Sequence, residues 1–251
     1  MAYFEIEGLT KDFGGLRAVD ALSCSVEQGK VTSLIGPNGA GKTTAFNLIS
    51  GFVRPSAGHV RYRDHDITGL GPDRIVALGL ARTFQDLRLF HRMTALENVT
   101  LGLQRQRGER LTHAVFGGAA LRAERGAARG RARAILEELG LGAKTGELAQ
   151  NLAYGEQKLL AIARAMATEA DLLLLDEPAA GLGRDATETI LGVIRGLVRR
   201  GCTVLLIDHH MEAVMDISDR VVVLDAGRKI AEGTPDEVQH NDEVVRVYLG
   251  L

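Results

Sequence analysis

The segment from Gly36 to Thr43 carries the residues with the clearest chemical potential. It reads Gly-Pro-Asn-Gly-Ala-Gly-Lys-Thr, fits the pattern GxxxxGK[ST], and lies between an apolar run and a stretch of helical composition. Glycines let consecutive backbone N–H groups turn inward around phosphate oxygens, and the helix N-terminus adds partial positive charge. We expect Lys42 to reach the β- and γ-phosphates of a nucleotide and Thr43 to ligate Mg²⁺. The predicted phosphate-binding residues are Gly36, Pro37, Asn38, Gly39, Ala40, Gly41, Lys42, Thr43 and Thr44; the alternative is a glycine-rich turn between a strand and a helix.

Two adjacent acids, Asp176 and Glu177, follow a run of four leucines, Leu172 to Leu175. In an open α/β sheet, ligands bind at the carboxyl ends of the strands. We therefore predict that Asp176 holds Mg²⁺ and that Glu177 takes a proton from an attacking water as general base. The alternative is an acidic turn that ends the strand, which explains one acid more readily than two.

Two further side chains are candidates for the same sheet edge. His209 follows the next apolar run, so it is expected to reach that edge and hydrogen-bond a γ-phosphate, although a single histidine is often structural or merely exposed. His210 is expected to point elsewhere. Gln85 ends the strand-like run 81–84, and its amide is a candidate partner for Mg²⁺ or for the attacking water.

The elements that must position these residues follow from the apolar pattern. Four runs are continuously apolar, at 31–35, 172–175, 203–207 and 220–224. Continuous rather than alternating runs predict buried parallel strands, hence an α/β core. Apolar residues alternate with polar or small ones at 4–9, 21–26 and 59–62, which predicts an antiparallel sheet with one solvated face.

Helix formers dominate between residues 90 and 155, which indicates a helical insert within the α/β core. A capping-box start is predicted at Thr94, and a long helix over 119–139. Another amphipathic helix is expected over 187–200. Near the end, 225–228 predicts a hairpin turn, and Thr234-Pro235 a short helix.

Composition excludes several classes of protein. The chain has 251 residues, 45% hydrophobic and 25% charged, so it can bury a full core and is neither disordered nor fibrous. The formal net charge of -2 provides no general attraction to nucleic acid or to anionic membranes. The apolar runs are far shorter than the roughly 20 residues that span a bilayer, and no secretory signal is recognised, so a cytoplasmic location is expected. Cys24 and Cys202 lack metal-ligand spacing and are expected to be small core residues.

Taken in order, these motifs resemble those of the ATP-binding subunit of an ABC transporter. The resemblance rests on the phosphate-binding motif, Gln85, the segment 151–157, the acidic pair and His209, and it covers essentially the whole chain. It implies a P-loop NTPase (ABC ATPase) core with an antiparallel β subdomain and an inserted helical subdomain, within a single ABC ATPase domain. The implied boundaries are about 1–86 and 170–251 for the core with its β subdomain, and about 87–169 for the helical subdomain. The implied ligands are ATP and Mg²⁺.

The resemblance assigns two further groups of residues. Leu152 to Glu156 corresponds to the signature loop, which acts in trans on the nucleotide of a second ATP-binding subunit; the implied contacts are Ala153, Gly155 and Glu156. Ala153 stands where the family usually has serine, which removes one hydroxyl, and Tyr154 replaces a glycine. Phe13 is similar to the aromatic residue that stacks on adenine, with a core phenylalanine at a strand end as the alternative.

The segment 81–99 and the ending 232–250 resemble the importer branch for branched-chain and related amino acids. The rivals are the ATPase of a lipopolysaccharide-type exporter, which shares the ending, and a soluble ABC ATPase that acts on DNA or ribosomes. The implied partners are an identical or paralogous ATP-binding subunit, transmembrane permease subunits and, indirectly, a solute-binding protein. No nucleic-acid partner is expected. Through the permease, the protein would lie peripherally on the inner face of the cell membrane.

Two surfaces are candidates for the permease contact. Residues 104–133 contain eight arginines against two glutamates, which indicates either a solvated helix face or contact with lipid headgroups or an acidic patch. By the resemblance, Asp86 to Phe90 belong to the groove that receives the permease. The alternative for the apolar residues Leu87, Leu89 and Phe90 is that they belong to the core.

Overall fold

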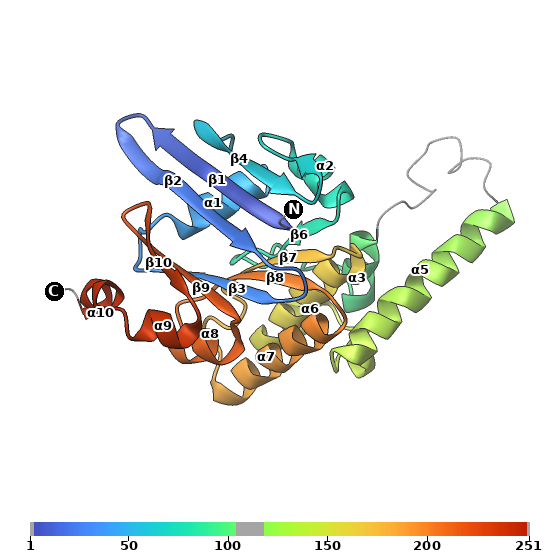
Figure 1. Ribbon diagram of the computed structural model, residues 1–251. Coiled ribbons are helices and arrows are strands. Elements are labelled where there is room, and N and C mark those ends of the chain that lie inside the picture. Colours follow the sequence, from blue (N-terminus) through green and yellow to red (C-terminus); the bar gives the residue numbers. More distant parts are fainter. Residues whose placement is uncertain (1–2, 104–117, 250–251) are drawn as a thin grey trace. The chain divides into compact units, whose positions relative to one another are not determined.

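The computed structural model describes residues 3–103 and 118–249 (Figure 1). The chain forms two compact units, one comprising Met1–Gln85 with Asp171–Leu251 and the other Asp86–Ala170. The expected fold class, an α/β core with an antiparallel β part and a helical insert, is confirmed.

The first unit is built on a six-stranded sheet in the order β10-β9-β3-β8-β7-β6. The pairings β9-β3, β3-β8, β8-β7 and β7-β6 are parallel, and β10 is antiparallel to β9. The bounds are β3 Val31–Ile35, β6 Leu80–Arg82, β7 Leu172–Asp176, β8 Thr203–Ile207, β9 Arg220–Asp225 and β10 Arg228–Gly233. The four predicted parallel strands are therefore confirmed, because strands covered on both faces are apolar at successive positions.

Strand β9 shows how the two faces of this sheet are covered. Val222 and Leu224 belong to one core cluster, which also contains residues of helix α1 (Lys42–Ile49) and of a second, four-stranded sheet. Val221 and Val223 belong to a second cluster with apolar residues of helices α8 (Met211–Ile217), α9 (Pro235–Gln239) and α10 (Asp242–Leu249). Alternate side chains of a strand point to opposite faces, so this one strand contributes to both cores.

The second sheet is antiparallel, in the order β2-β1-β4-β5. Its strands are β1 Phe4–Phe13, β2 Leu16–Val26, β4 Ala57–Tyr62 and β5 His65–Asp66. The antiparallel sheet was predicted, but β1 and β2 run beyond the predicted 4–9 and 21–26. The two strands form one hairpin and pair as far as Phe13 opposite Leu16. The added residues are more polar and lack an alternating pattern, so their strand conformation depends on the pairing itself.

Six helices of the first unit have the bounds α1 Lys42–Ile49, α2 Pro72–Ala77, α7 Arg184–Arg199, α8 Met211–Ile217, α9 Pro235–Gln239 and α10 Asp242–Leu249. Helix α7 begins three residues before the predicted start, with Gly183 as its N-cap. The single helix expected from Thr234 is two helices, separated at His240 and Asn241. Helices α2 and α8 are not predicted from the sequence, because they have only six and seven residues and therefore show little periodicity.

The second unit is helical, with α3 Ala95–Gly102, α5 Gly118–Glu138 and α6 Tyr154–Ala167, and with short turns η2 Gly142–Lys144 and η3 Ala149–Asn151. The predicted capping box is present, because the Thr94 hydroxyl accepts from the Glu97 N–H while the Glu97 carboxylate accepts from the Thr94 N–H. Helix α3 packs against α5 and α6. Within the described residues, no helix combines the length and the apolar character needed to cross a bilayer.

Asn98 organises the loop that leads into α3. Its buried side chain donates to the carbonyl oxygens of Phe90, Met93 and Thr94 at 3.0, 3.3 and 3.0 Å, and its Oδ1 accepts from the Phe90 N–H at 3.0 Å. We expect Asn98→Ala to lower the free energy of unfolding by about 2–3 kcal/mol, since buried backbone groups lose their partner. Urea denaturation measures this. Leu101→Ala, at an exposed position of the same helix, is the control and should cost much less; an equal loss in both variants would contradict the role of Asn98.

Both cysteines are free thiols, half-buried in the first unit. Burial raises the pKa of Cys24 to about 12 and that of Cys202 to about 11. Cys24 packs against the core shared by the two sheets. The thiols are therefore protonated near neutral pH and act as small packing residues.

Candidate functional site: a phosphate-binding loop at a sheet edge

The loop after β3 is shaped by glycines. Gly36 has φ +149°, and a Cβ there would lie 2.1 Å from the Leu224 carbonyl oxygen. Gly41, the N-cap of α1, has φ +98°, and its Cβ would lie 2.4 Å from the Ala18 carbonyl oxygen. Only glycine fits both positions, because an L side chain would meet backbone that cannot move aside. The loop is thus held tightly between β9 and β2, and it leads directly into a helix N-terminus.

Lys42 lies at the first position of α1 and is buried. Its Nζ donates to the carbonyl oxygens of Gly36 and Pro37, both at 2.8 Å. Burial lowers the pKa of Lys42, and the negative charges of Glu177 and Asp176 oppose that effect. Because α1 begins at Lys42, Lys42 and Thr43 are both held by helical backbone.

A cavity of about 640 Å³ opens over this loop. That volume is within the usual range for a small-molecule site. Its walls include the predicted residues Asn38, Gly39, Ala40, Gly41, Lys42, Thr43, Thr44, Gln85 and Glu177. The structure therefore brings together most of the phosphate-binding set, Gln85 and the predicted base, although Gln85 is 92 positions from Glu177 in the sequence.

The cavity is also lined by residues that the sequence motifs do not predict, namely Leu16, Arg17, Ala18, Ala226 and Gly227. Leu16 to Ala18 begin β2, and the other two form the β9–β10 turn. Phe13 lies outside the lining. It ends β1 with 47% of its surface exposed, which excludes the core alternative, and Lys11 Nζ lies 5.0 Å from its ring centroid. Stacking of Phe13 on adenine stays a prediction.

The two acids after β7 differ in environment. The Asp176 side chain is buried and forms an ion pair at 2.8 Å between Oδ2 and Arg82 Nη2. Glu177 has φ +48°, a sparsely populated conformation for a non-glycine residue, and its N–H donates to the Ile207 carbonyl at 2.8 Å. Such strain is typical of functional positions. Its Oε2 accepts from Gln85 Nε2 at 3.1 Å, so in this structure the Gln85 amide contacts the predicted base.

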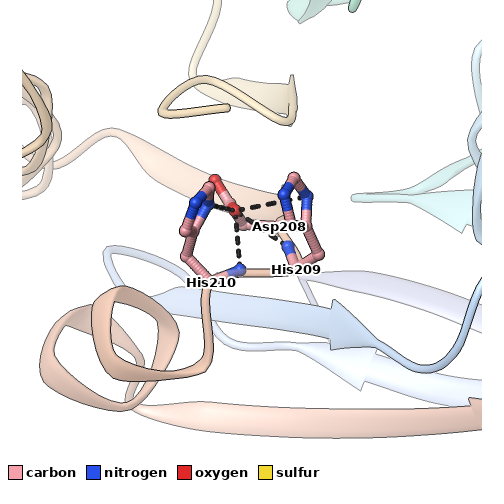
Figure 2. Close-up of side chains that lie close together, drawn as sticks. All are labelled: Asp208, His209 and His210. Carbon is pink, nitrogen blue, oxygen red and sulfur yellow. Dashed lines mark hydrogen bonds and ion pairs between the residues drawn. The ribbon is translucent and has the colours of Figure 1, made fainter. Parts of the chain in front are cut away.

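Three consecutive residues follow β8, and Figure 2 shows the rings of His209 and His210 side by side at Asp208. His209 Nδ1 lies 3.7 Å from Glu177 Oε2, which places His209 at the predicted edge. Asp208 is buried; its Oδ1 accepts from the His209 and His210 N–H groups at 2.8 and 3.0 Å and contacts His210 Nδ1 at 3.0 Å. The two ring centroids lie 4.3 Å apart, because Asp208 contacts both residues. The ion pair with Glu177 is formed by His209, and that His210 points away from a γ-phosphate stays a prediction.

The predicted metal ligands Thr43, Gln85 and Asp176 offer a hydroxyl, an amide and a carboxylate, which are the oxygen donors that Mg²⁺ prefers. Thr43 and Gln85 line the cavity, whereas Asp176 is buried and does not line it. The donor set therefore fits a magnesium ion. Of these three residues, Asp176 also forms an ion pair, with the guanidinium of Arg82.

The segment that resembles a signature loop begins helix α6 in the second unit. The helix starts at Tyr154, and Ala153 is its N-cap without a side-chain hydrogen bond. The Glu156 carboxylate accepts from the Ala153 N–H at 3.0 Å and from Lys144 Nζ at 2.5 Å. Hydrogen bonding by Lys144 lowers the pKa of Glu156. Glu156 is thus engaged within its own chain, and contact of Ala153, Gly155 and Glu156 with a partner's nucleotide stays a prediction.

The candidate permease contacts are partly described. Residues 104–117 of the arginine-rich insert lie outside the described residues, while the arginines of α5, at 122, 125, 129, 131 and 133, are all exposed. Leu89 is buried, but Phe90 is 49% exposed beneath the guanidinium of Arg164, 5.3 Å from the ring centroid. Leu87 and Arg88 have φ +53° and +45°. This loop is therefore divided between core and surface.

Comparison with known proteins places these features in a wider group. A family described as "ABC transporter" matches residues 19–180, and one described as "Branched-chain amino acid ATP-binding cassette transporter" matches residues 228–250. A "High-affinity branched-chain amino acid transport ATP-binding protein BraF" of Pseudomonas aeruginosa is 43% identical, over 98% of this chain and 97% of the relative. The corresponding protein LivG of Salmonella typhimurium is 42% identical, over 98% and 96%.

Solved structures have the same fold. A nucleotide-free ATP-binding cassette from an ABC transporter superposes with a TM-score of 0.86 at 33% identity, covering 100% of both chains. A dimeric cassette in a post-hydrolysis state, bound to ADP and Pi, has a TM-score of 0.77 at 25% identity, covering 92% of this chain and 98% of the other. The similarity thus extends over the whole chain and includes cassettes with and without nucleotide.

Proposed function

This chain belongs to the ABC transporter family, and on that premise we propose that it is the ATP-binding and hydrolysing subunit of an importer for branched-chain or related amino acids. ATP binding is a property of the family. The observation that carries the choice of solute is the match of residues 228–250 to the branched-chain amino-acid cassette family. This match favours the importer over a lipopolysaccharide-type exporter or a soluble ABC ATPase.

Nucleotide binding is assigned to the loop after β3. Backbone N–H groups of the loop and of the first turn of α1 would surround the phosphates, with Lys42 exchanging its two carbonyl partners for phosphate oxygens. Thr43, Gln85 and Asp176 would hold Mg²⁺, which neutralises phosphate charge when bound. The adenine would lie toward Phe13, beside the wall formed by Leu16 to Ala18.

Hydrolysis is assigned to Glu177 with support from Gln85 and His209. Glu177 would accept a proton as the oxygen of a water attacks the γ-phosphorus, and the bond from that phosphorus to the bridging oxygen of ADP breaks, releasing ADP and phosphate. Gln85 and His209 lie within 3.1 and 3.7 Å of Oε2 of Glu177. This arrangement suits Gln85 to orient the water and His209 to contact the γ-phosphate.

The assembly would contain two ATP-binding subunits, identical or paralogous, with each nucleotide also contacting Ala153, Gly155 and Glu156 of the other subunit. Closure on ATP and reopening after hydrolysis would drive separate transmembrane permease subunits, which receive solute from a binding protein. The chain would lie in the cytoplasm at the inner face of the membrane, held there by the permease. Exposed Phe90 and the arginines of α5 are the surfaces proposed for that contact.

Uptake in cells lacking this chain tests the proposal. We expect initial uptake of labelled leucine from submicromolar solution to fall at least tenfold and to return when the wild-type chain is restored. Glu177→Gln should fail to restore it, whereas Leu101→Ala, an exposed change in the helical unit, should succeed. Undiminished uptake of leucine, isoleucine and valine, with normal ATPase activity of the purified chain, would refute the assigned solute class.

A further inference from the structure

Arg82 is a buried cation within the first unit. It ends β6, and only 5% of its side chain is exposed. Its guanidinium carbon lies 5.4 Å from the ring centroid of Phe46 and 5.0 Å from that of Phe84. Two aromatic rings thus contact the guanidinium, whose charge makes its removal from water costly in free energy.

The polar contacts of Arg82 join three elements. Nη2 donates to Asp176 Oδ2 at 2.8 Å, while Nη1 donates to Asn47 Oδ1 at 2.8 Å and to Ser50 Oγ at 2.9 Å. Asn47 lies in α1, the helix that begins at the phosphate-binding loop, and Ser50 is its C-cap. Asp176 ends β7. The guanidinium therefore links the C-terminal end of α1 to strand β7, which carries the predicted metal ligand. The phosphate-binding loop lies at the other end of α1.

A buried ion pair is weak evidence for a contribution to stability. The desolvation of two charges offsets most of their attraction, and apolar residues of similar size often serve a core equally well. A planar guanidinium, however, presents several donors in a rigid fork, so it sets the orientation of the carboxylate that it binds. Lysine has a similar charge but lacks the fork.

We propose that Arg82 is a positioning residue for Asp176: it holds Oδ2 so that the other oxygen, Oδ1, is directed to the metal of the bound nucleotide. The inference rests on the proposed function, because it presupposes that Asp176 is a ligand of that metal. Arg82 also balances negative charge at an edge where Asp176, Glu177 and Asp208 lie at the ends of neighbouring strands. Its hydrogen bonds to Asn47 and Ser50 fix the position of the guanidinium relative to α1.

The test compares Arg82→Lys with the wild-type chain in binding of a fluorescent ADP analogue, first with EDTA and then across a Mg²⁺ titration. We expect the metal-free affinity to stay within twofold, while the Mg²⁺ concentration for half-maximal enhancement rises about tenfold. Arg63→Lys, at an exposed arginine of the first unit that pairs with Asp171, is the matched control and should behave as wild type. Mn²⁺ binding followed by EPR in the presence of ADP should show the same tenfold weakening.

Different results would overturn the positioning role of Arg82 and the metal site itself. A folded Arg82→Lys chain with a wild-type Mg²⁺ midpoint overturns the positioning role, even if its unfolding temperature falls. A wild-type chain whose nucleotide affinity ignores Mg²⁺ overturns the metal site itself. If Arg82→Lys fails to fold, the double variant Asn47→Ala with Ser50→Ala replaces it in the test. This variant keeps the ion pair with Asp176 but removes the other two hydrogen-bond acceptors of the guanidinium. A threefold rise in the Mg²⁺ midpoint is expected, and no rise overturns the proposal.

Discussion

Replacing Glu177 with Gln is expected to lower ATP turnover by about 10²–10⁴-fold, the usual contribution of a general base. The amide has nearly the shape of the carboxylate but cannot accept the proton of the attacking water. Binding of ATP should persist within about threefold, because Lys42 and the loop amides are unchanged. Phosphate release measured under saturating ATP and Mg²⁺ gives the turnover, and titration with a fluorescent ATP analogue gives the affinity.

The same variant should accumulate as an ATP-bound dimer, since closure precedes hydrolysis in the proposed cycle. Size-exclusion chromatography with ATP should then show a shift to twice the mass for Glu177→Gln and a smaller one for wild type. Glu188→Gln, an exposed change of the same type in α7, should match wild type in both assays. Near-normal turnover of Glu177→Gln would remove Glu177 from the role of general base.

Replacing Lys42 with Ala is expected to weaken ATP binding about 100-fold or more. The ammonium group makes charge-assisted hydrogen bonds, which contribute about 1.5–3 kcal/mol each, and a tenfold change in affinity corresponds to about 1.4 kcal/mol. Because Lys42 Nζ also binds the Gly36 and Pro37 carbonyls, its loss should loosen the loop itself. Titration with a fluorescent ATP analogue measures the change in affinity.

A suitable control is Lys30→Ala, which removes an exposed lysine paired with Glu27. Its ATP affinity should equal that of wild type. Thermal unfolding of both variants distinguishes a lost phosphate contact from a misfolded loop. If Lys42→Ala is folded and binds ATP with wild-type affinity, the phosphate-binding role of the loop lysine is wrong.

The local parts of the site could be predicted from the sequence because their physics is local. The phosphate-binding loop depends on residues in one short segment, in which glycine permits the turns, lysine is suited to phosphate and threonine to Mg²⁺. Likewise, a strand buried on both faces must be apolar throughout, so Leu172–Leu175 and Thr203–Ile207 are recognisable as parallel strands. Short helices such as α8 could not be predicted, since seven residues hold too little of the helical period.

Contacts between distant segments required the folded chain. Arg82 and Asp176 are 94 positions apart, and an isolated arginine in a strand reads as a surface residue until the neighbouring strand, α1 and two aromatic rings are seen around it. The cavity walls at Leu16 and Gly227 have no chemical signature of their own. Their position beside the loop follows from how β2 and the β9–β10 turn pack.

The sequence by itself determined the chemical inventory: a phosphate-binding loop, two acids at a strand end, a histidine after the next strand, and the family to which this order of motifs belongs. The tertiary structure alone decided which atoms meet, placing Gln85 and His209 at Glu177 and giving Asp176 a buried cationic partner. The physical reason is that residue type sets what a side chain can bind. Strand order and helix packing, which involve the whole chain, set what it does bind.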